Sequence, residues 1–545
     1  MKLRYLLVAL FVGMVTSLYA QTHKEGIEYY KADQYNNARE LLKRNLNNPG
    51  TDKALSYYYL GEIEAYQGKT ADATKYFNDG IAIDPNCPYN YVGLGALALQ
   101  NGDIKGAEKL FKEAESKSKK DYTLQMDIAR AYYNADPVTY KDKYQKKIEN
   151  ALKKDVENPD IYILQGDILR DEANASGNAK TYGLAAANYE MAMGYDPTSA
   201  VAYVKYADMY TKLANPNYEY AIKKLQELLR NNPSSALGQR QLANAYYESN
   251  QFDKAAEQYG KYVENPNHFK EDEDQYSLLL FFNGDYQKGY DYASNLVKEN
   301  PNNSSALQYQ FINAAQIDTY KDQLLPMSDN LIRLKKNNAN LKFAPATYTI
   351  IGITLANANR TDEAVALMND AIKNYDNNIN FYKNIVDIYF TAEDYEKTSD
   401  AYKEYLAHLP EPGYNEYLQQ AAYAYYGGTQ NQNPAYYNTA IEYANKAIAL
   451  MPDQYRPHKI LGDIAIQQAP KDQQLTAAIP EYETAIQLFE ANPDPRYNND
   501  VKNIYRYLGI TNINSNPAKA KQYLGKYIQI DPNDADINKA YNELK

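Results

Sequence analysis

Cysteine, tryptophan and histidine are nearly absent from this sequence of 545 residues, which has one cysteine, no tryptophan and four histidines. The single cysteine, Cys87, excludes an intramolecular disulfide and a zinc–thiolate cluster. Long basic runs are also absent: Lys and Arg number 58 against 69 Asp and Glu, and the net charge is −11. A chain with this charge balance is a poor ligand for nucleic acid or anionic membranes.

One short apolar run lies at the N-terminus, between residues 6 and 15, after two basic residues. A basic start, a short apolar run and a small residue, here Ala20, are typical of a secretory signal peptide. The run is shorter than the roughly 18–20 residues needed to cross a bilayer, and no longer one follows. We therefore expect residues 1–20 to be a signal peptide, cleaved before Gln21, although a cytosolic N-terminal helix is the alternative. Without a cysteine after the cleavage point, we expect a soluble periplasmic or extracellular chain that does not insert into a membrane.

A repeated spacing dominates the rest of the sequence. A small residue is followed by an alanine, at twelve positions in the regular units, and then by a large apolar or aromatic residue four positions later. Some units carry a few extra residues between the first two. The pattern is found at Gly61, Ala73 and Phe77; Gly95, Ala107 and Phe111; Gly166, Ala185 and Tyr189; Ala243, Ala255 and Tyr259; Gly352, Ala364 and Met368; and Gly462, Ala478 and Tyr482.

These residues resemble the tetratricopeptide repeat, whose helix A carries the small residue and whose helix B carries the alanine and the large residue. A proline after helix B, as at Pro85, stops each unit. The resemblance implies an all-α, right-handed superhelical solenoid of about fourteen antiparallel helix pairs. We expect an N-terminal array over 21–265 and a C-terminal array over 266–545, the latter ending in a polar capping helix from residue 535. No linker separates them, so one continuous solenoid remains an alternative.

Tyrosine is abundant, with 59 residues. In tetratricopeptide repeats four positions of helix A line the concave surface, and tyrosine there offers a large contact area and a hydroxyl group. Tyr76, Tyr189 and Tyr482 fall on helix B and are expected to be buried between helices. The alternative is that tyrosine reflects only the composition of an A/T-rich genome. Counting from the small residue, the resemblance implies an exposed partner-binding groove that contains Tyr30, Tyr58, Tyr89, Tyr247, Tyr423 and Tyr426.

The same count places charged and amide side chains on this surface. Arg240 with Asn244 resembles the carboxylate clamp of chaperone-binding repeat proteins, but Gln275 stands where the next unit would need an asparagine. The alternative is a solvated helix face whose isolated charges contribute little. The polar groove positions are Glu62, Asp167, Arg170, Asp208, Arg240, Asn244, Arg456, Lys459, Asp463 and Arg506.

No motif of a catalytic serine, a metallopeptidase or a phosphate-binding loop occurs, so we expect no enzymatic activity, cofactor or metal. The resemblance implies a protein–protein interaction scaffold that binds a partner peptide or helix along its concave groove, here in the bacterial cell envelope. The alternative is a glycan-capture protein associated with an outer-membrane uptake system. The absence of a lipid-attachment cysteine and of tryptophan weighs against it.

Overall fold

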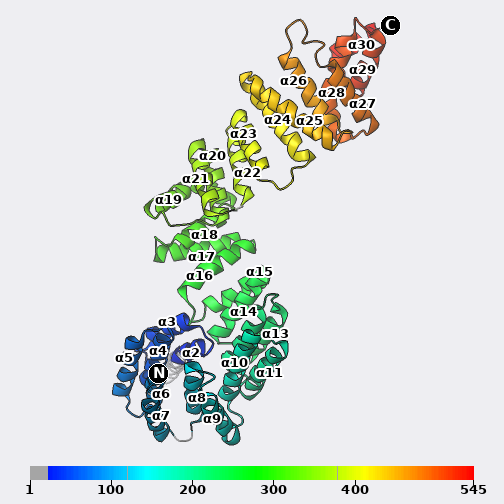
Figure 1. Ribbon diagram of the computed structural model, residues 1–545. Coiled ribbons are helices and arrows are strands. Elements are labelled where there is room, and N and C mark those ends of the chain that lie inside the picture. Colours follow the sequence, from blue (N-terminus) through cyan, green and yellow to red (C-terminus); the bar gives the residue numbers. More distant parts are fainter. Residues whose placement is uncertain (1–21, 119–120, 377, 545) are drawn as a thin grey trace, which may run out of the picture. The chain divides into compact units, whose positions relative to one another are not determined.

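The computed structural model describes residues 22–118, 121–376 and 378–544 (Figure 1). The expected signal peptide and the cleavage point before Gln21 lie outside these residues. The described residues form 29 α-helices and two short 3-10 helices, with no β-strand among them. Fourteen antiparallel helix pairs and a final helix follow one another, which confirms the all-α repeat solenoid. Within the described ranges, no helix is both long and apolar enough to cross a bilayer.

The first eight pairs extend from residue 22 to residue 299. Their helices are α2 (Thr22–Lys31) with α3 (Tyr35–Asn45), α4 (Lys53–Tyr66) with α5 (Thr70–Ile83), α6 (Tyr89–Gln100) with α7 (Ile104–Lys117), α8 (Tyr122–Ala135) with α9 (Lys141–Lys154), α10 (Pro159–Ser176) with α11 (Ala179–Tyr195), α12 (Ala200–Thr211) with α13 (Tyr218–Asn231), α14 (Ala236–Glu248) with α15 (Phe252–Val263), and α16 (Lys270–Phe282) with α17 (Tyr286–Glu299).

Six further pairs and the terminal helix follow. They are α18 (Ser304–Ala314) with α19 (Leu324–Asn337), α20 (Pro345–Asn357) with α21 (Thr361–Asn374), α22 (Ile379–Thr391) with α23 (Tyr395–Ala407), α24 (Tyr414–Asn431) with α25 (Pro434–Leu450), α26 (Tyr455–Gln468) with α27 (Ile479–Ala491), α28 (Asn498–Asn512) with α29 (Pro517–Ile530), and α30 (Ala535–Glu543).

Local side chains set the ends of these helices. Asp52, Asp103 and Asp121 each accept a hydrogen bond from a backbone N–H in the first turn of the helix that follows, at 2.9–3.1 Å. The turn between helix A and helix B often needs a positive φ, which glycine adopts freely, as at Gly68 with φ 74°. In the first pair Asp33 takes this conformation with φ 64°, which is uncommon for a residue with a side chain.

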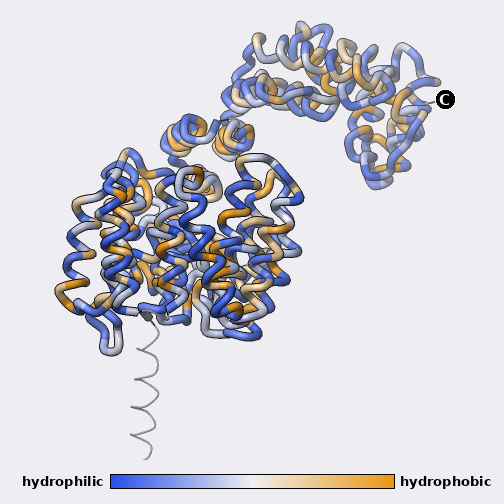
Figure 2. Tube along the Cα trace, turned by 60° about the horizontal axis from the view of Figure 1, so that its bottom comes forward, coloured by the Kyte–Doolittle hydropathy of each residue, from blue (hydrophilic) through white to orange (hydrophobic). Residues whose placement is uncertain are grey.

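The small residue of each unit lets the paired helices approach closely. A Cβ atom built on Gly61 would overlap the Phe77 ring, and one on Gly166 would lie 2.6 Å from the Tyr189 ring. Tyr189 and Tyr482 are buried, as the register predicts. Tyr76 is only half-buried and packs against another tyrosine at the helix surface, so its expected burial is wrong. Hydrophobic and hydrophilic residues alternate along the helices accordingly (Figure 2).

The helices group into two compact units, residues 22–289 and residues 290–544. Residues 266–289 therefore lie with the first unit, whereas the sequence-based boundary at 265/266 assigned them to the second array. The reason is long-range packing: the Phe269 ring meets the Tyr29 ring edge-on at 5.3 Å between centroids. Asp272 in α16 also accepts two hydrogen bonds from Arg240 in α14, at 2.7 and 3.0 Å.

The first unit closes on itself. Helix α2 packs against α4, its neighbour in the repeat order, but it also contacts α12 and α14, which belong to the sixth and seventh pairs. The A helices of the first unit thus surround helix α2, and they do not line an open groove. Any site on their inner surface is shaped by the first helix pair.

Candidate ligand-binding surface of the first unit

Polar groups of α2 fix the closure by contacting the first turns of distant helices. The Glu25 carboxylate accepts a hydrogen bond from the Leu237 N–H at 2.7 Å, at the start of α14. Lys31 Nζ lies 2.8 Å from Asp160 Oδ1 in the first turn of α10. A carboxylate is favoured at a helix N-terminus, where backbone N–H groups lack intrahelical acceptors.

A buried ion-pair network lies beside this contact. Asp167, 3% exposed, is 2.8 Å from Arg130 Nη1 and 3.0 Å from the Lys205 ammonium, and it accepts a hydrogen bond from the Tyr189 hydroxyl at 2.8 Å. Lys205, itself buried, also reaches Asp33 at 2.8 Å. Burial alone would raise the pKa of Asp167, but Lys205 and the two nearby guanidinium groups hold it well below its usual range. The network therefore stays ionised and joins α2 to α8, α10 and α12.

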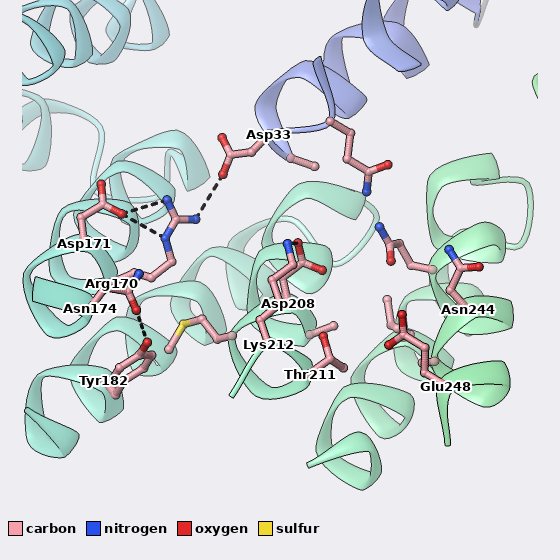
Figure 3. Close-up of a pocket in the computed structure, with 17 residues that line it drawn as sticks. Asp33, Arg170, Asp171, Asn174, Tyr182, Asp208, Thr211, Lys212, Asn244 and Glu248 are labelled. Carbon is pink, nitrogen blue, oxygen red and sulfur yellow. Dashed lines mark hydrogen bonds and ion pairs between the residues drawn. The ribbon is translucent and has the colours of Figure 1, made fainter. Parts of the chain in front are cut away.

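One cavity of about 760 Å³ lies on one side of Asp33. Figure 3 shows Arg170, Asn174 and Tyr182 on one wall and Asn244 with Glu248 on the opposite wall. Two contacts hold the first of these walls: the Tyr182 hydroxyl donates to Asn174, and Arg170 pairs with Asp33 at 3.2 Å. The lining is mostly polar and contains carboxylates, amides and two cations, so the cavity suits a hydrogen-bonding ligand.

A second cavity of about 640 Å³ lies between α2, α4, α8 and α10. It shares Asp33, Arg170 and Asp171 with the first cavity, so these residues lie between the two. Its wall combines tyrosines with carboxylates. The Tyr30 hydroxyl donates to Glu62 Oε2 at 3.2 Å, inside the cavity.

Two carboxyl groups of the second cavity are electrostatically unsatisfied. Burial, followed by the charge of Asp127, raises the pKa of Glu62 to about 7. Burial also raises the pKa of Asp127 to about 7, against the opposing effect of Lys31. Asp127 Oδ2 is buried and lacks a hydrogen-bond partner among the described residues. Leaving such an atom unpaired costs free energy, and the described residues of this wall supply no hydrogen-bond donor to it.

The tyrosines predicted to line a groove in the first unit lie in different environments. Tyr30 lines the second cavity, Tyr89 is half-buried and donates to Asp121 at 2.8 Å, and Tyr247 is half-buried against Phe252. Tyr58 is only 3% exposed, so its expected exposure is wrong. Neighbouring rings cover it, because Tyr59, Phe77 and Tyr89 all lie within 6.2 Å of its ring centroid.

Arg240 and Asn244, the pair that resembles a carboxylate clamp, have different environments. Arg240 makes a bidentate ion pair with Asp272, and a guanidinium held in this way is not free to bind a partner carboxylate. Asn244 lines the first cavity, where its side-chain oxygen accepts a hydrogen bond from Tyr259. The structure thus gives no support to a carboxylate clamp at this position.

In the second unit the predicted groove residues also differ from one another. Tyr423, 8% exposed, is covered by Phe390 and Tyr402, which corrects its expected exposure. Tyr426, 48% exposed, is accessible as expected. Arg456 is exposed and lies over the Tyr497 ring, 5.3 Å from its centroid. Lys459 pairs with Asp463 one helical turn later at 2.7 Å.

Sequence reasoning missed several cavity residues of the first unit. Glu62, Asp167, Arg170 and Asp208 were counted as groove positions, and all four line a cavity. The missed ones lie on α2, the first residue of α3, the last residue of α4, α8 and the start of α10. The stretch that contains α8 lacks most of the repeat's signature residues, so no register was counted there. The missed residues are Lys31, Tyr35, Tyr66, Asp127, Arg130, Tyr133 and Asp160.

The described part of the chain contains no group of three His, Cys, Asp or Glu side chains arranged to hold a metal ion. Cys87 is buried, and burial raises the pKa of its thiol above the ordinary value. A buried thiol of raised pKa is a weak nucleophile. The chemistry that the inner surface does offer is recognition by charge, hydrogen bonds and aromatic contact.

Comparison with known proteins gives a family likeness over part of the chain. Residues 210–268 match the family model described as tetratricopeptide repeat. A tetratricopeptide repeat-containing protein of the archaeon Methanocaldococcus jannaschii is 25% identical over 207 residues, which is 38% of this chain and 36% of that protein. The chain therefore spans about a third of the length of this relative.

Solved structures of repeat proteins resemble the chain more loosely. The C-terminal part of a repeat-containing protein from Cytophaga hutchinsonii is 16% identical, with a TM-score of 0.39, over 49% of this chain and 98% of that one. A tetratricopeptide repeat protein from Parabacteroides merdae is 14% identical, with a TM-score of 0.33, over 48% of this chain and 97% of that one.

Proposed function

Because this chain is a tetratricopeptide repeat protein, we propose that it is a non-catalytic scaffold of the bacterial cell envelope that holds a segment of a partner protein. The segment binds on the inner surface of the first unit, beside the docked helix α2. Repeat arrays of this kind present extended surfaces on which many modest contacts add up to useful affinity.

The main support for this proposal is the pair of cavities on either side of Asp33. Together they offer a polar, partly aromatic surface on consecutive A helices, and an extended segment passing Asp33 would contact both. The residues around them are held by ion pairs and hydrogen bonds, so little ordering is needed on binding. Arg170 and Asp171 line both cavities and would contact the segment at its centre.

The envelope location rests on the basic and apolar pattern of residues 1–20. Intact mass and N-terminal sequencing of the protein from its native host should give a chain that begins at Gln21 and carries no lipid. An N-terminus at Met1 or an acylated chain would contradict export in the proposed form.

Crosslinking in the native envelope, followed by capture of the protein and mass spectrometry, tests the scaffold function. We expect one or a few partner proteins to be recovered in stoichiometric amount, with crosslinks on the inner helices of the first unit. Recovery of soluble oligosaccharide in place of protein would favour the alternative, a glycan-capture protein of an uptake system. Turnover of a recovered molecule would contradict a non-catalytic role.

A further inference from the structure

We propose that the second cavity of the first unit is a pocket for a basic side chain, lysine or arginine, of the partner polypeptide. This inference rests on the proposed function and names the chemistry that the inner surface selects. It is carried by an imbalance of charge in the cavity, by the aromatic residues that lead into it, and by the continuation of the surface on the other side of Asp33.

The cations of the cavity are already engaged. Lys31 pairs with Asp160 at 2.8 Å, Arg130 with Asp167 at 2.8 Å. Arg170 pairs with Asp171 at 3.1 Å and with Asp33 at 3.2 Å. None of these cations is left over for the remaining carboxyl groups of the wall.

Glu62 and Asp127 are the carboxyl groups left without a cation within ion-pair distance among the described residues. Burial raises the pKa of both to about 7, and like charge adds to it, from Asp127 on Glu62 and from Asp160 on Asp127. A bound ammonium or guanidinium group would offset both charges at once. An ionised pair buried with a cation and hydrogen bonds is far more favourable than the same carboxylates unpaired.

Aromatic rings lead from solvent to these carboxyl groups. Tyr66 is 69% exposed, and its ring lies 4.2 Å from that of Tyr35. Tyr35 in turn lies 5.5 Å from Tyr30, whose hydroxyl donates to Glu62. Such a wall suits the apolar stem of a lysine or arginine side chain and attracts its cationic end through the ring faces.

The surface extends beyond the space that a single amine fills. The two cavities share Asp33, Arg170 and Asp171, and together they are lined by eight carboxylates against four Lys and Arg side chains. Residues that flank the bound basic side chain would reach the first cavity, where amides and carboxylates again predominate. Charge complementarity of this kind favours a basic segment of a protein and speeds its association.

The test compares two fluorescein-labelled peptides, four repeats of Lys-Gly-Ser and the same peptide with norleucine in place of lysine. Fluorescence anisotropy with the purified protein at neutral pH and low salt should show the lysine peptide binding at least tenfold more tightly. The double substitution Glu62→Gln with Asp127→Asn should remove that preference. The control Asp72→Asn with Glu113→Gln, which removes two exposed negative charges from α5 and α7, should keep it.

Thermal melting should show the Glu62→Gln, Asp127→Asn protein to be as stable as the parent, because the change removes a repulsion. If that variant does not fold, Tyr66→Ala at the exposed mouth should weaken lysine-peptide binding several-fold. Equal binding of the two peptides, or a lysine preference that survives the double substitution, would overturn the pocket. Spermidine that binds as tightly as the lysine peptide would overturn the polypeptide ligand.

The crosslinking experiment tests the proposed function independently of the pocket. A partner that crosslinks to the inner surface, and whose affinity is unchanged by the double substitution, would end this inference and leave the scaffold function standing. Absence of any crosslinked partner would instead count against the scaffold function itself.

Discussion

The two units of this protein are built from the same repeat, yet among the described residues extensive contacts between a first helix and distant repeats are found in the first unit alone. In the first unit α2 contacts α12 and α14, and Lys31 pairs with Asp160 across 129 positions of sequence. In the second unit the extensive helix contacts join helices at most two places apart, and side-chain contacts such as Tyr455 Oη with Asp500 join neighbouring repeats. The repeat alone therefore sets each helix pair, whereas closure depends on a few contacts between distant side chains, charged as in Lys31 with Asp160 and aromatic as in Tyr29 with Phe269.

A pair of matched aspartates shows this difference in detail. Asp167 and Asp463 each follow the small glycine of their unit, and each accepts a hydrogen bond from the helix B tyrosine, at 2.8 Å and 2.5 Å. Asp463 has one lysine beside it, on its own helix. Asp167 has three cations, from α8, α10 and α12. Two of them, Arg170 and Lys205, also pair with Asp33 next to α2, which links Asp167 to the closure.

Replacing the shared tyrosine is expected to have the largest effect, and to be similar in both units. Tyr189→Ala and Tyr482→Ala each remove a buried ring that packs on the glycine of helix A. Each should lower the free energy of unfolding by about 3–5 kcal/mol through lost burial and a cavity. Hydrogen exchange followed by mass spectrometry of peptides measures the two units separately. A much smaller loss in either unit would mean that its register has been misassigned.

Replacing the matched aspartates should separate the units. Asp167→Ala leaves the buried Lys205 with Asp33 as its remaining ion-pair partner, and it should destabilise the first unit by about 3 kcal/mol. Asp463→Ala should cost the second unit about 1 kcal/mol, since Lys459 there is partly exposed. Chemical denaturation with local hydrogen exchange provides both values. Equal losses would contradict the assignment of Asp167 to the closure.

The pH dependence of stability should also differ between the units. Burial raises the pKa of Glu25 to about 7, and burial with the charge of Glu25 raises that of Glu28 to about 8. A carboxyl group whose folded pKa exceeds its unfolded value stabilises the fold fully below the unfolded pKa, and that contribution is lost as the pH rises through the folded pKa. Glu62 and Asp127 act in the same direction. His23 opposes them, because burial lowers its pKa.

Four carboxyl groups against one histidine predict a first unit that is less stable at pH 8 than at pH 5, by several kcal/mol, since a single group with a folded pKa of about 7 accounts for about 2–3 kcal/mol. Asp33, Asp160 and Asp167, whose pKa values are lowered by their ion pairs despite burial, lose their contribution only below about pH 4. Exchange rates of α2 and α14 amides at the two pH values provide the measurement. Glu25→Gln with Glu28→Gln should flatten the difference, and a first unit that gains stability with rising pH would contradict it.

The smallest effects on stability are expected at partly exposed groove tyrosines. Tyr247→Ala and Tyr426→Ala should each change the free energy of unfolding by less than about 1 kcal/mol. Because Tyr247 lines neither cavity of the first unit and Tyr426 lies in the second unit, neither substitution should change the affinity for the partner by more than about 0.5 kcal/mol. Thermal melting and titration with the recovered partner give the two numbers. A loss of affinity only in the Tyr426 variant would move the site to the second unit.

The repeat spacing was sufficient to predict the fold, because residues such as Gly61 and Phe77 meet within one helix pair. It was not sufficient for the inner surface. Tyr58 and Tyr423 occupy groove positions, but rings from adjacent turns and repeats cover them, which a count along one helix does not reveal. The contact between Lys31 and Asp160 has no local signal at all, since it depends on how tightly successive pairs turn.

Site-specific photo-crosslinking in the native envelope tests the central claim that the inner surface of the first unit holds the partner. A benzophenone amino acid would replace Tyr66, which is 69% exposed at the mouth of the second cavity, and, in a control, Tyr220, which is 50% exposed on α13 and lines neither cavity. We expect one discrete adduct with a partner protein from position 66 and none from position 220. An adduct from position 220 alone, or the same adducts from both positions, would contradict it.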